Sequence, residues 1–344
     1  MVDSIRYSDK KFLSRYDLYI DLFNRFDLKV NDVVPLRNVF LIFSDKGKKI
    51  LKKVEYSRDK LEFIYDAVEY IRKSFDRVMS FTRTKEGEIF TVWNGELYCV
   101  LDLVEARECE FTNPIDVAIA AKGMAEMHRA SEGFKTHISE RYMVGKTIDN
   151  FKRKYEELIF FKNLANLHEY KNDFDKLYLS NLGYYLNEVE KSIELLKEAP
   201  YFKISSEEDK IAICHHDLAH HNILIKDNLA YFIDFDYAVV DIKVHDLCNF
   251  ITKAIKNFAF DMDKTKDIIN AYRSANSLDI RELAILKALL AFPEDFYSIS
   301  KDYYSRRKEW DEDTFLDRFE KKLEYKEDRE DFLKGFQECI INEK

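Results

Sequence analysis

Nine consecutive residues, 214–222, read CHHDLAHHN and contain four histidines, one aspartate and one asparagine. Such side chains can bind a metal ion, or one carboxylate can act as a general base while its neighbours position it. His216 and His220 are four residues apart, a spacing that points two imidazoles the same way on a helix. The segment lies between two apolar runs typical of strands, so a loop is expected, and no HExxH glutamate is present. A histidine metal site is therefore the less favoured interpretation.

The second interpretation starts from the hairpin that follows this loop. Residues 222–225 and 229–234 are apolar runs around a turn centred on residues 227–228, which places Asn222 across from residues 233 and 234. Asn222 and Asp234 should then meet at the open end of the ladder, with Asp217 beside them. Hard oxygen ligands in this arrangement suit Mg²⁺, which usually completes its shell with waters and phosphate oxygens.

The pattern H-x-D-x(4)-N, followed by a hairpin and an Asp-Phe pair, resembles the catalytic core of protein-kinase-like phosphotransferases. The resemblance implies that Asp217 is the catalytic base that accepts a proton from a substrate hydroxyl. The resemblance also places His215 in the catalytic set, as the residue that would brace the loop. Asn222 and Asp234 would hold Mg²⁺ on the phosphates of ATP.

Further segments narrow this resemblance. Asp236 stands where protein kinases carry the glycine of Asp-Phe-Gly, which is similar to the aminoglycoside phosphotransferase and choline kinase branch. The chain also resembles the spore-coat protein S (CotS) kinase-like family of spore-forming bacteria over nearly its whole length. The segments that carry this likeness are 50–54 (ILKKV), 215–222 (HHDLAHHN), 233–238 (IDFDYA) and 245–247 (HDL).

The resemblance also implies a nucleotide site in the N-terminal part. Lys52 best matches the lysine that contacts nucleotide phosphates; Lys53 would face the opposite side, so the strand register decides between them. Glu62 and Glu69 both flank the apolar stripe of the next helix, and either could pair with that lysine. Leu103 matches the connection between lobes, where backbone groups meet adenine. The alternative for Lys52 is a lysine that faces solvent, and the alternative for Leu103 is an ordinary strand end.

Other polar residues near the core have less specific interpretations. Asp246 matches an acid that braces the catalytic loop, although a helix cap would look the same. Asp236 and Asp241 are either supporting acids or exposed. His216, His220 and His221 are expected to be structural or solvent-facing. Residues 34–38, in place of a glycine-rich phosphate loop, contain no glycine, which lowers the expected affinity for ATP.

The elements that must position these residues indicate a two-lobed α+β design, and the resemblance implies that this is the protein-kinase-like fold. Residues 1–104 would form a small β-rich nucleotide-binding lobe with one helix, 57–74, and two hairpins, 38–54 and 88–104, the second around Asn94-Gly95. Residues 105–344 would form a mainly helical lobe with the catalytic loop 213–222 and the metal-binding hairpin 222–236. Asn113-Pro114 should start a helix that runs to residue 130, and two long helices are expected within 145–200.

Composition excludes several classes of protein. The 344-residue chain is 46% hydrophobic and 35% charged, with a net charge of −9, which argues against broad nucleic-acid binding. No run approaches 18 apolar residues, and the N-terminus MVDSIRYSDKK lacks the apolar core of a signal peptide, so neither a membrane span nor export is expected. Five scattered cysteines suit a reducing compartment. Synthesis in the cytoplasm is the expectation.

These observations together predict an ATP- and Mg²⁺-dependent phosphotransferase of the aminoglycoside and choline kinase type. Its partners would be the nucleotide and a small hydroxylated acceptor, and the resemblance adds other spore-coat proteins and deposition in the spore coat. The alternative is a catalytically weak or inactive kinase-like structural protein of the coat.

Overall fold

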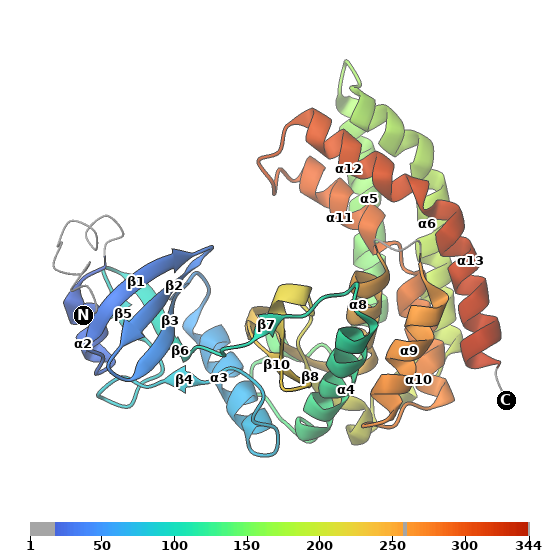
Figure 1. The fold of residues 1–344 in the computed structure, drawn as a ribbon. Coiled ribbons are helices and arrows are strands. Elements are labelled where there is room, and N and C mark those ends of the chain that lie inside the picture. The colour runs from blue at the N-terminus through green and yellow to red at the C-terminus, as the bar shows by residue number, and fades with distance from the viewer. Residues whose placement is uncertain (1–17, 257–259, 343–344) are drawn as a thin grey trace.

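A small β-rich lobe and a large helical lobe lie side by side in the computed structural model of the chain (Figure 1). The structure describes residues 18–256 and 260–342. The N-terminal segment, on which the expected absence of a signal peptide rests, lies outside the described residues. In the described part, none of the helices is long and apolar enough to cross a membrane.

The small lobe is built on a six-stranded antiparallel sheet with the order β1-β2-β3-β6-β4, and β5 pairs with β6. The strands are β1 (Val30–Leu36), β2 (Val39–Ser44), β3 (Gly47–Val54), β4 (Phe81–Thr82), β5 (Thr91–Trp93) and β6 (Glu96–Asp102). Both predicted hairpins are confirmed. Asn94 and Gly95 have φ angles of 49° and 82°, as the two-residue turn between β5 and β6 requires.

Among the described residues, two helices flank this sheet, where the sequence predicted one. The predicted helix is α3 (Arg58–Arg72), capped by the Ser57 side chain, and the additional one is α2 (Ile20–Arg25). Leu22 and Phe23 of α2 pack with Leu51 and Val100 of the sheet. α3 contacts both lobes, because Leu61 packs against the sheet while five further residues join the main core of the large lobe. These five are Phe63, Ile64, Ala67, Val68 and Ile71.

The large lobe consists of helices around two small sheets, with strand orders β10-β9-β7 and β11-β8. Its strands are β7 (Arg107–Glu108), β8 (Ile211–Cys214), β9 (Ile223–Lys226), β10 (Leu229–Phe232) and β11 (Val239–Ile242). Its α-helices are α4 (Pro114–Ala130), α5 (Thr147–Leu167), α6 (Asp173–Glu198), α7 (Tyr201–Ile204), α8 (Val244–Ile255), α9 (Met262–Arg273), α10 (Ile280–Ala291), α11 (Glu294–Tyr304), α12 (Glu312–Glu324) and α13 (Lys326–Phe336). The predicted start of α4 is confirmed, with Asn113 as the cap and Pro114 at the first position.

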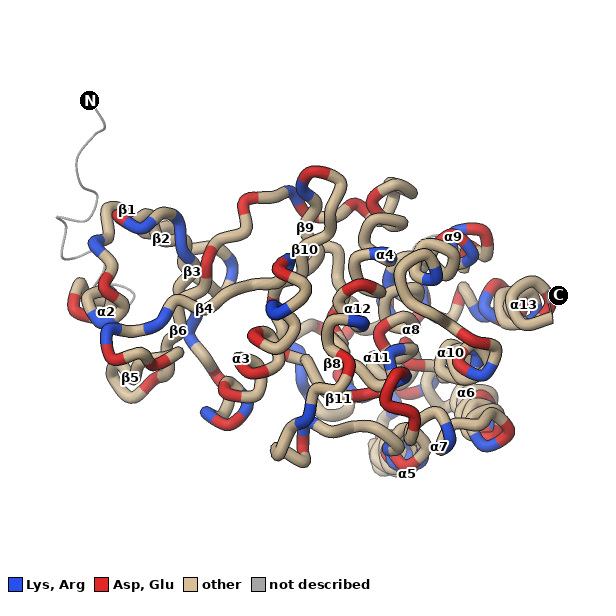
Figure 2. The backbone as a smooth tube through the Cα atoms, turned by 90° about the horizontal axis from the view of Figure 1, so that it is seen from below, with Lys and Arg blue, Asp and Glu red and all other residues tan. Residues whose placement is uncertain are grey.

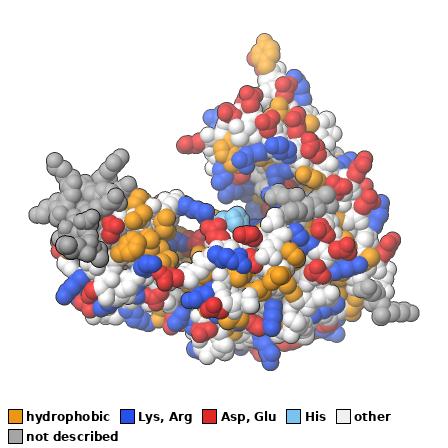
Figure 3. Space-filling view, in the orientation of Figure 1, with side chains coloured by type: hydrophobic (Ala, Val, Ile, Leu, Met, Phe, Trp, Pro, Cys, Tyr) orange, Lys and Arg blue, Asp and Glu red, His pale blue; other side chains and the backbone are white. Residues whose placement is uncertain are grey.

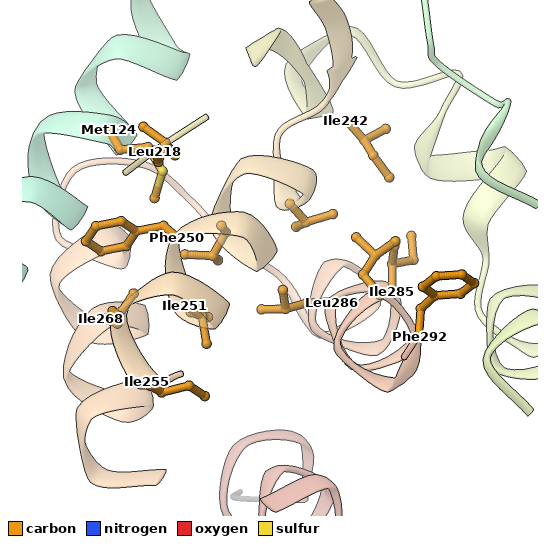
Figure 4. Packing of buried hydrophobic residues seen from close by; sticks show 14 of the residues in the cluster. Met124, Leu218, Ile242, Phe250, Ile251, Ile255, Ile268, Ile285, Leu286 and Phe292 are labelled. Carbon is orange, nitrogen blue, oxygen red and sulfur yellow. The ribbon is translucent and has the colours of Figure 1, made fainter. Parts of the chain in front are cut away.

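The core of the large lobe fixes the catalytic loop from below. Leu218, fully buried and next in sequence to Asp217, points into the core beside Met124 of α4 and Phe250 of α8 (Figure 4). α4 also approaches β10 closely at Gly123, where an added Cβ atom would lie 2.8 Å from the Cβ of Ala230. Along the backbone, acidic and basic positions are interspersed over both lobes (Figure 2).

Candidate functional site

Asp246, in the first turn of α8, holds the start of the loop 215–222. Its buried carboxylate accepts hydrogen bonds from the backbone N–H groups of His215 (2.5 Å) and His216 (2.7 Å). His128 Nε2 lies 3.1 Å from the same carboxylate, and the Tyr272 hydroxyl lies 2.8 Å from His128 Nδ1. Burial opposes the charge of Asp246, but the hydrogen bond with His128 holds its pKa well below the usual value. The geometry therefore agrees with a brace for the loop.

His215 is fully buried and joins the loop to the end of β10. Its Nε2 lies 2.9 Å from the carbonyl oxygen of Ile233, and its Nδ1 accepts a 3.3 Å hydrogen bond from the backbone N–H of Asp217. The side chain thus connects Ile233, which directly precedes Asp234, to Asp217, the candidate base. His215 is placed as a positioning residue, which agrees with the predicted brace and does not suit direct contact with a substrate.

Asp217 and Asn222 lie in direct contact. Asn222 Nδ2 donates hydrogen bonds to the Asp217 backbone oxygen (2.9 Å) and to its carboxylate oxygen Oδ2 (3.0 Å). The backbone N–H of Leu218 donates to the side chain of Asn249 in α8 at 3.0 Å. These bonds fix the Asp217 carboxylate at the edge of the loop, where about a quarter of its side chain is exposed.

Asp234 follows β10 and lies across the ladder from Asn222, as predicted. The backbone N–H of Ile233 donates to the Asn222 carbonyl oxygen at 3.0 Å, and Asp234 itself has a left-handed backbone with φ 64°. A non-glycine residue in this region costs roughly 1–3 kcal/mol, so the surrounding structure must hold it. His216, on the other side of Asp217, also has a positive φ, 59°. Each of the two segments that meet at the site, the loop 215–222 and the end of the β9–β10 hairpin, therefore contains one residue with a strained backbone.

Lys52 reaches this site from the small lobe. Its ammonium nitrogen lies 2.7 Å from carboxylate oxygens of both Asp234 and Asp236. Burial alone would lower the pKa of Lys52, but the two carboxylates outweigh it and raise the pKa above the usual 10.5. Lys53 faces away from these aspartates and pairs with Glu96 at 3.1 Å, so Lys52 is the lysine that reaches Asp234. The contact of Lys52 with nucleotide phosphates stays a prediction.

The expected pairing of Lys52 with a glutamate of α3 is wrong for this structure. Glu62 pairs with Arg58 at 2.8 Å, and Glu69 with Arg72 at 3.5 Å, each within the helix. Both glutamates lie on the solvent side of the apolar stripe of α3. Lys52 instead takes the two aspartates Asp234 and Asp236 as partners.

Leu103 lies in the connection that leaves β6 and leads into the large lobe. Its backbone N–H donates to the carbonyl oxygen of Lys48 at 3.4 Å, a long hydrogen bond. A cavity of about 510 Å³ opens at this connection. It is lined by Lys46, Gly47, Lys48, Lys49, Asp102, Leu103 and Glu105. The adenine contact of Leu103 stays a prediction.

Several residues at the site escaped the sequence analysis. Lys253 of α8 forms an ion pair with the Asp217 carboxylate, and Asn249 lies one turn before it. The spacing of Asp246, Asn249 and Lys253 follows one helix face, a signal that could have been read once Asp246 was identified. Tyr56 donates a 2.9 Å hydrogen bond to Asp236. No sequence pattern indicates that contact.

The donor set fits a divalent cation. Asn222 turns its amide nitrogen toward Asp217, which leaves its oxygen for another partner, and Asp234 follows across the ladder. The carboxylates of Asp234 and Asp236 share the single ammonium group of Lys52, so this group of three side chains is negatively charged and attracts cations. Figure 3 shows that the surface is hollowed between the small lobe and the projecting helices of the large lobe, with acidic and histidine side chains at the floor of the hollow. A metal ion held by Asn222 and Asp234 would bring a phosphate close to the partly exposed carboxylate of Asp217.

Comparison with a family model gives a match over residues 20–336 to the family described as "Spore coat putative kinase YutH". Spore coat protein S of Bacillus subtilis (strain 168) is 21% identical over 329 residues, which cover 94% of this chain and 92% of that protein. The predicted likeness to spore-coat kinase-like proteins is thus confirmed.

Solved structures of phosphotransferases share the fold. An aminoglycoside phosphotransferase from Alicyclobacillus acidocaldarius superposes with a TM-score of 0.82 at 18% identity, covering 95% of this chain and 97% of its own. A spectinomycin phosphotransferase in complex with ADP and spectinomycin has a TM-score of 0.65 at 17% identity, with 92% and 97% covered. At these identities the likeness establishes the protein-kinase-like fold, which confirms the predicted fold class.

Proposed function

The chain belongs to the spore-coat family described as "Spore coat putative kinase YutH", and on this premise we propose that it is an ATP- and Mg²⁺-dependent phosphotransferase. Its acceptor would be a small hydroxylated molecule. The observation that carries the proposal is the contact of Asp217 with Asn222, with Asp234 across the ladder and Lys52 arriving from the other lobe. Three separate segments supply these side chains, namely the loop 215–222, the end of the β9–β10 hairpin and β3, so their meeting is a property of the fold.

Each of these residues has a part in the proposed reaction. Asp217 accepts the proton of the acceptor hydroxyl, and Asn222 and Asp234 hold Mg²⁺, which would neutralise phosphate charge. Lys52 exchanges one carboxylate partner for a phosphate oxygen, and the backbone at Leu103 meets adenine. In this proposal residues 1–104 bind the nucleotide, and residues 105–344 supply the base and the acceptor site.

Arg37 occupies the place of a glycine-rich phosphate loop. The strands β1 and β2 are joined by the two residues Arg37 and Asn38, and Arg37 has a positive φ of 50°. Its guanidinium lies 3.5 Å from Glu108 in the large lobe. A guanidinium can bind phosphate where a close backbone approach is not available. We expect weaker nucleotide binding than a glycine-rich loop would give.

ATP turnover in the Asp217→Asn variant tests the proposal. Loss of a general base should lower turnover by about 10²- to 10⁴-fold, while Asn preserves the size of the side chain. Asp227→Asn, in the exposed turn between β9 and β10, serves as the control and should turn over like the wild type. Full turnover by Asp217→Asn would overturn the assignment of the base.

A second candidate function is a kinase-like structural component of the spore coat. Asp234 and Asp217 already have cationic partners within the chain, Lys52 and Lys253, so neither carboxylate depends on a bound ligand for its ion pair. The coat name of the Bacillus subtilis relative supports other coat proteins as partners, with synthesis in the cytoplasm before deposition in the coat. The net charge of −9 supports neither nucleic acid nor an anionic membrane surface as a partner.

A thermal shift experiment separates the two functions. A nucleotide site should raise the melting temperature in millimolar ATP and Mg²⁺, because ligand binding to the folded state stabilises it. The shift should vanish in Asp234→Ala. A wild-type protein with no shift would favour the structural role.

A further inference from the structure

A second cluster of side chains that could bind a metal lies where the catalytic loop meets β11 and α8. His216 comes from the loop, Asp241 from β11 and His245 from the first turn of α8. Asp241 Oδ2 lies 3.8 Å from His216 Nε2 and 3.6 Å from His245 Nε2, and the three ligand atoms all lie within 4.8 Å of one another. The two imidazole rings are roughly parallel, with centroids 5.7 Å apart.

The hydrogen bonds of this cluster are incomplete. His216 Nε2 is buried and has no hydrogen-bond partner among the described residues. A buried polar nitrogen without a partner is costly and rare. Asp241 is 3% exposed, and its Oδ2 faces the two imidazoles while its Oδ1 accepts a bond from its neighbour's backbone N–H. Lys146 acts on this carboxylate only from a distance.

A neighbouring cluster shows how such a group looks when hydrogen bonds satisfy it. His128, Cys214 and Asp246 also bring three possible ligands together, and all three are buried. There, both nitrogens of His128 have partners and Asp246 accepts two backbone N–H bonds. That group is complete without a metal. The cluster at Asp241 is not complete.

The dimensions of the open cluster suit a small tetrahedral cation. Zn²⁺ bonds of about 2.0–2.1 Å to nitrogen and oxygen put neighbouring ligand atoms roughly 3.3 Å apart. The observed separations of 3.6 and 3.8 Å therefore need only small side-chain movements to reach that geometry. The donor set of two imidazole nitrogens and one carboxylate oxygen is typical of Zn²⁺ sites.

A fourth oxygen is also close. The hydroxyl of Thr147 lies 2.8 Å from His245 Nε2 and itself accepts a 2.8 Å hydrogen bond from the Tyr201 hydroxyl. In the structure, this hydroxyl is the partner of His245. On metal binding, the hydroxyl, or a water that it orients, would fill the remaining position.

We propose that His216, Asp241 and His245 form a Zn²⁺ site that holds the catalytic loop against β11 and α8. The site would fix His216 in its left-handed conformation, directly before Asp217. The pair of histidines differs from the pair suggested by sequence spacing, since His220 is exposed and its Nε2 lies 3.8 Å from Glu108. This site does not depend on phosphotransferase activity.

Zinc binding by the full-length protein, stripped with a chelator and free of nucleotide, tests this site. When Zn²⁺ is added back to the stripped protein, we expect one equivalent to remain bound after desalting and the melting temperature to rise. Co²⁺ in its place should give visible absorption bands typical of tetrahedral coordination. In the near-isosteric Asp241→Asn variant, and in His216→Ala, Zn²⁺ affinity should fall by at least about tenfold, and the Co²⁺ bands should be lost.

The controls exclude other sites and misfolding. The double variant His220→Ala, His221→Ala changes the other histidines of the loop and should bind Zn²⁺ like the wild type, as should Asp234→Ala. Circular dichroism would check that Asp241→Asn is folded. His216→Ala gives a second measurement of Zn²⁺ affinity, at a residue that is less buried. Failure of the wild type to retain Zn²⁺ would overturn the proposal. Retention by Asp241→Asn and His216→Ala, or loss in the His220, His221 variant, would overturn it equally.

Discussion

The ammonium of Lys253 forms an ion pair with one carboxylate oxygen of Asp217, and Asn222 donates a hydrogen bond to the other oxygen. The candidate base thus lies between a cation from α8 and an amide from its own loop. A positive charge beside the base would lie close to the phosphoryl group during transfer. Lys253 therefore joins the set of residues that the proposed reaction would use.

Replacing Lys253 should impair transfer. In Lys253→Met the charge near the transferred phosphoryl group is lost, and we expect turnover to fall by about 10- to 100-fold, with partial recovery in Lys253→Arg. Steady-state ATP turnover provides the measurement. Lys256→Met, one turn later and paired with Asp295 at 3.5 Å, is the matched control. If Lys253→Met kept its full rate, the cation would have only a structural role.

The ion pairs of Lys52 should stabilise the fold in a pH-dependent way. The pKa of Lys52 is raised above 10.5 in the folded chain, although burial opposes its charge. The folded state therefore binds this proton more tightly, so the stabilisation is complete below about pH 10 and is lost as the pH rises through the folded-state pKa. The free energy of unfolding of Lys52→Met should be lower by roughly 1–2 kcal/mol at neutral pH.

Denaturant unfolding of wild type and Lys52→Met across the alkaline range provides the test of these ion pairs. The difference in unfolding free energy should stay level near neutral pH and shrink only at high pH. Lys53→Met, on the opposite face of β3, should show no measurable difference at any pH. A difference that persists unchanged in strong alkali would argue against a charge effect.

Loss of the Asp246 brace should destabilise the large lobe. Asn at this position offers one acceptor oxygen in place of two, so one backbone N–H of the loop or His128 is left unsatisfied in a buried site. The expected loss in Asp246→Asn is about 2–4 kcal/mol of unfolding free energy. Asp263→Asn, an exposed acid in the first turn of α9, is the control for a helix N-terminal charge. Similar small losses in both variants would reduce Asp246 to an ordinary first-turn acid.

The close approach of α4 to β10 predicts a contrast between two helical glycines. Gly123→Ala places a Cβ atom 2.8 Å from that of Ala230 and should cost about 1–3 kcal/mol through overpacking. Gly183→Ala, exposed on α6 with open space around it, should stabilise the fold by about 0.5–1 kcal/mol. Thermal or denaturant unfolding measures both. Equal effects of the two substitutions would mean that the α4–β10 packing is loose.

Local signals in the sequence were sufficient for most elements of the fold. The cap at Asn113, the Asn94-Gly95 turn and the hairpin after Asn222 each depend on neighbouring residues, and the structure confirms all three. Strand β1 escaped prediction because it contains Asn31, Asp32 and Pro35. Such a strand is tolerated because it lies at the edge of the sheet, where proline removes no ladder bond.

The site shows where sequence reasoning ends. The loop spacing and the hairpin register placed Asn222 and Asp234 together, because both depend on a few adjacent residues. The partners of Lys52 could not be obtained this way, since the lobes meet through tertiary packing. The ion pair of Lys253 with Asp217 spans 36 residues and depends on how α8 docks beneath the loop.

Isothermal titration with a non-hydrolysable ATP analogue tests the central claim most directly. The claim predicts binding by the wild type that requires Mg²⁺, with affinity weakened by at least about tenfold in Asp234→Ala and in Asn222→Ala. Binding that is the same with and without Mg²⁺, or unchanged in both variants, would contradict it.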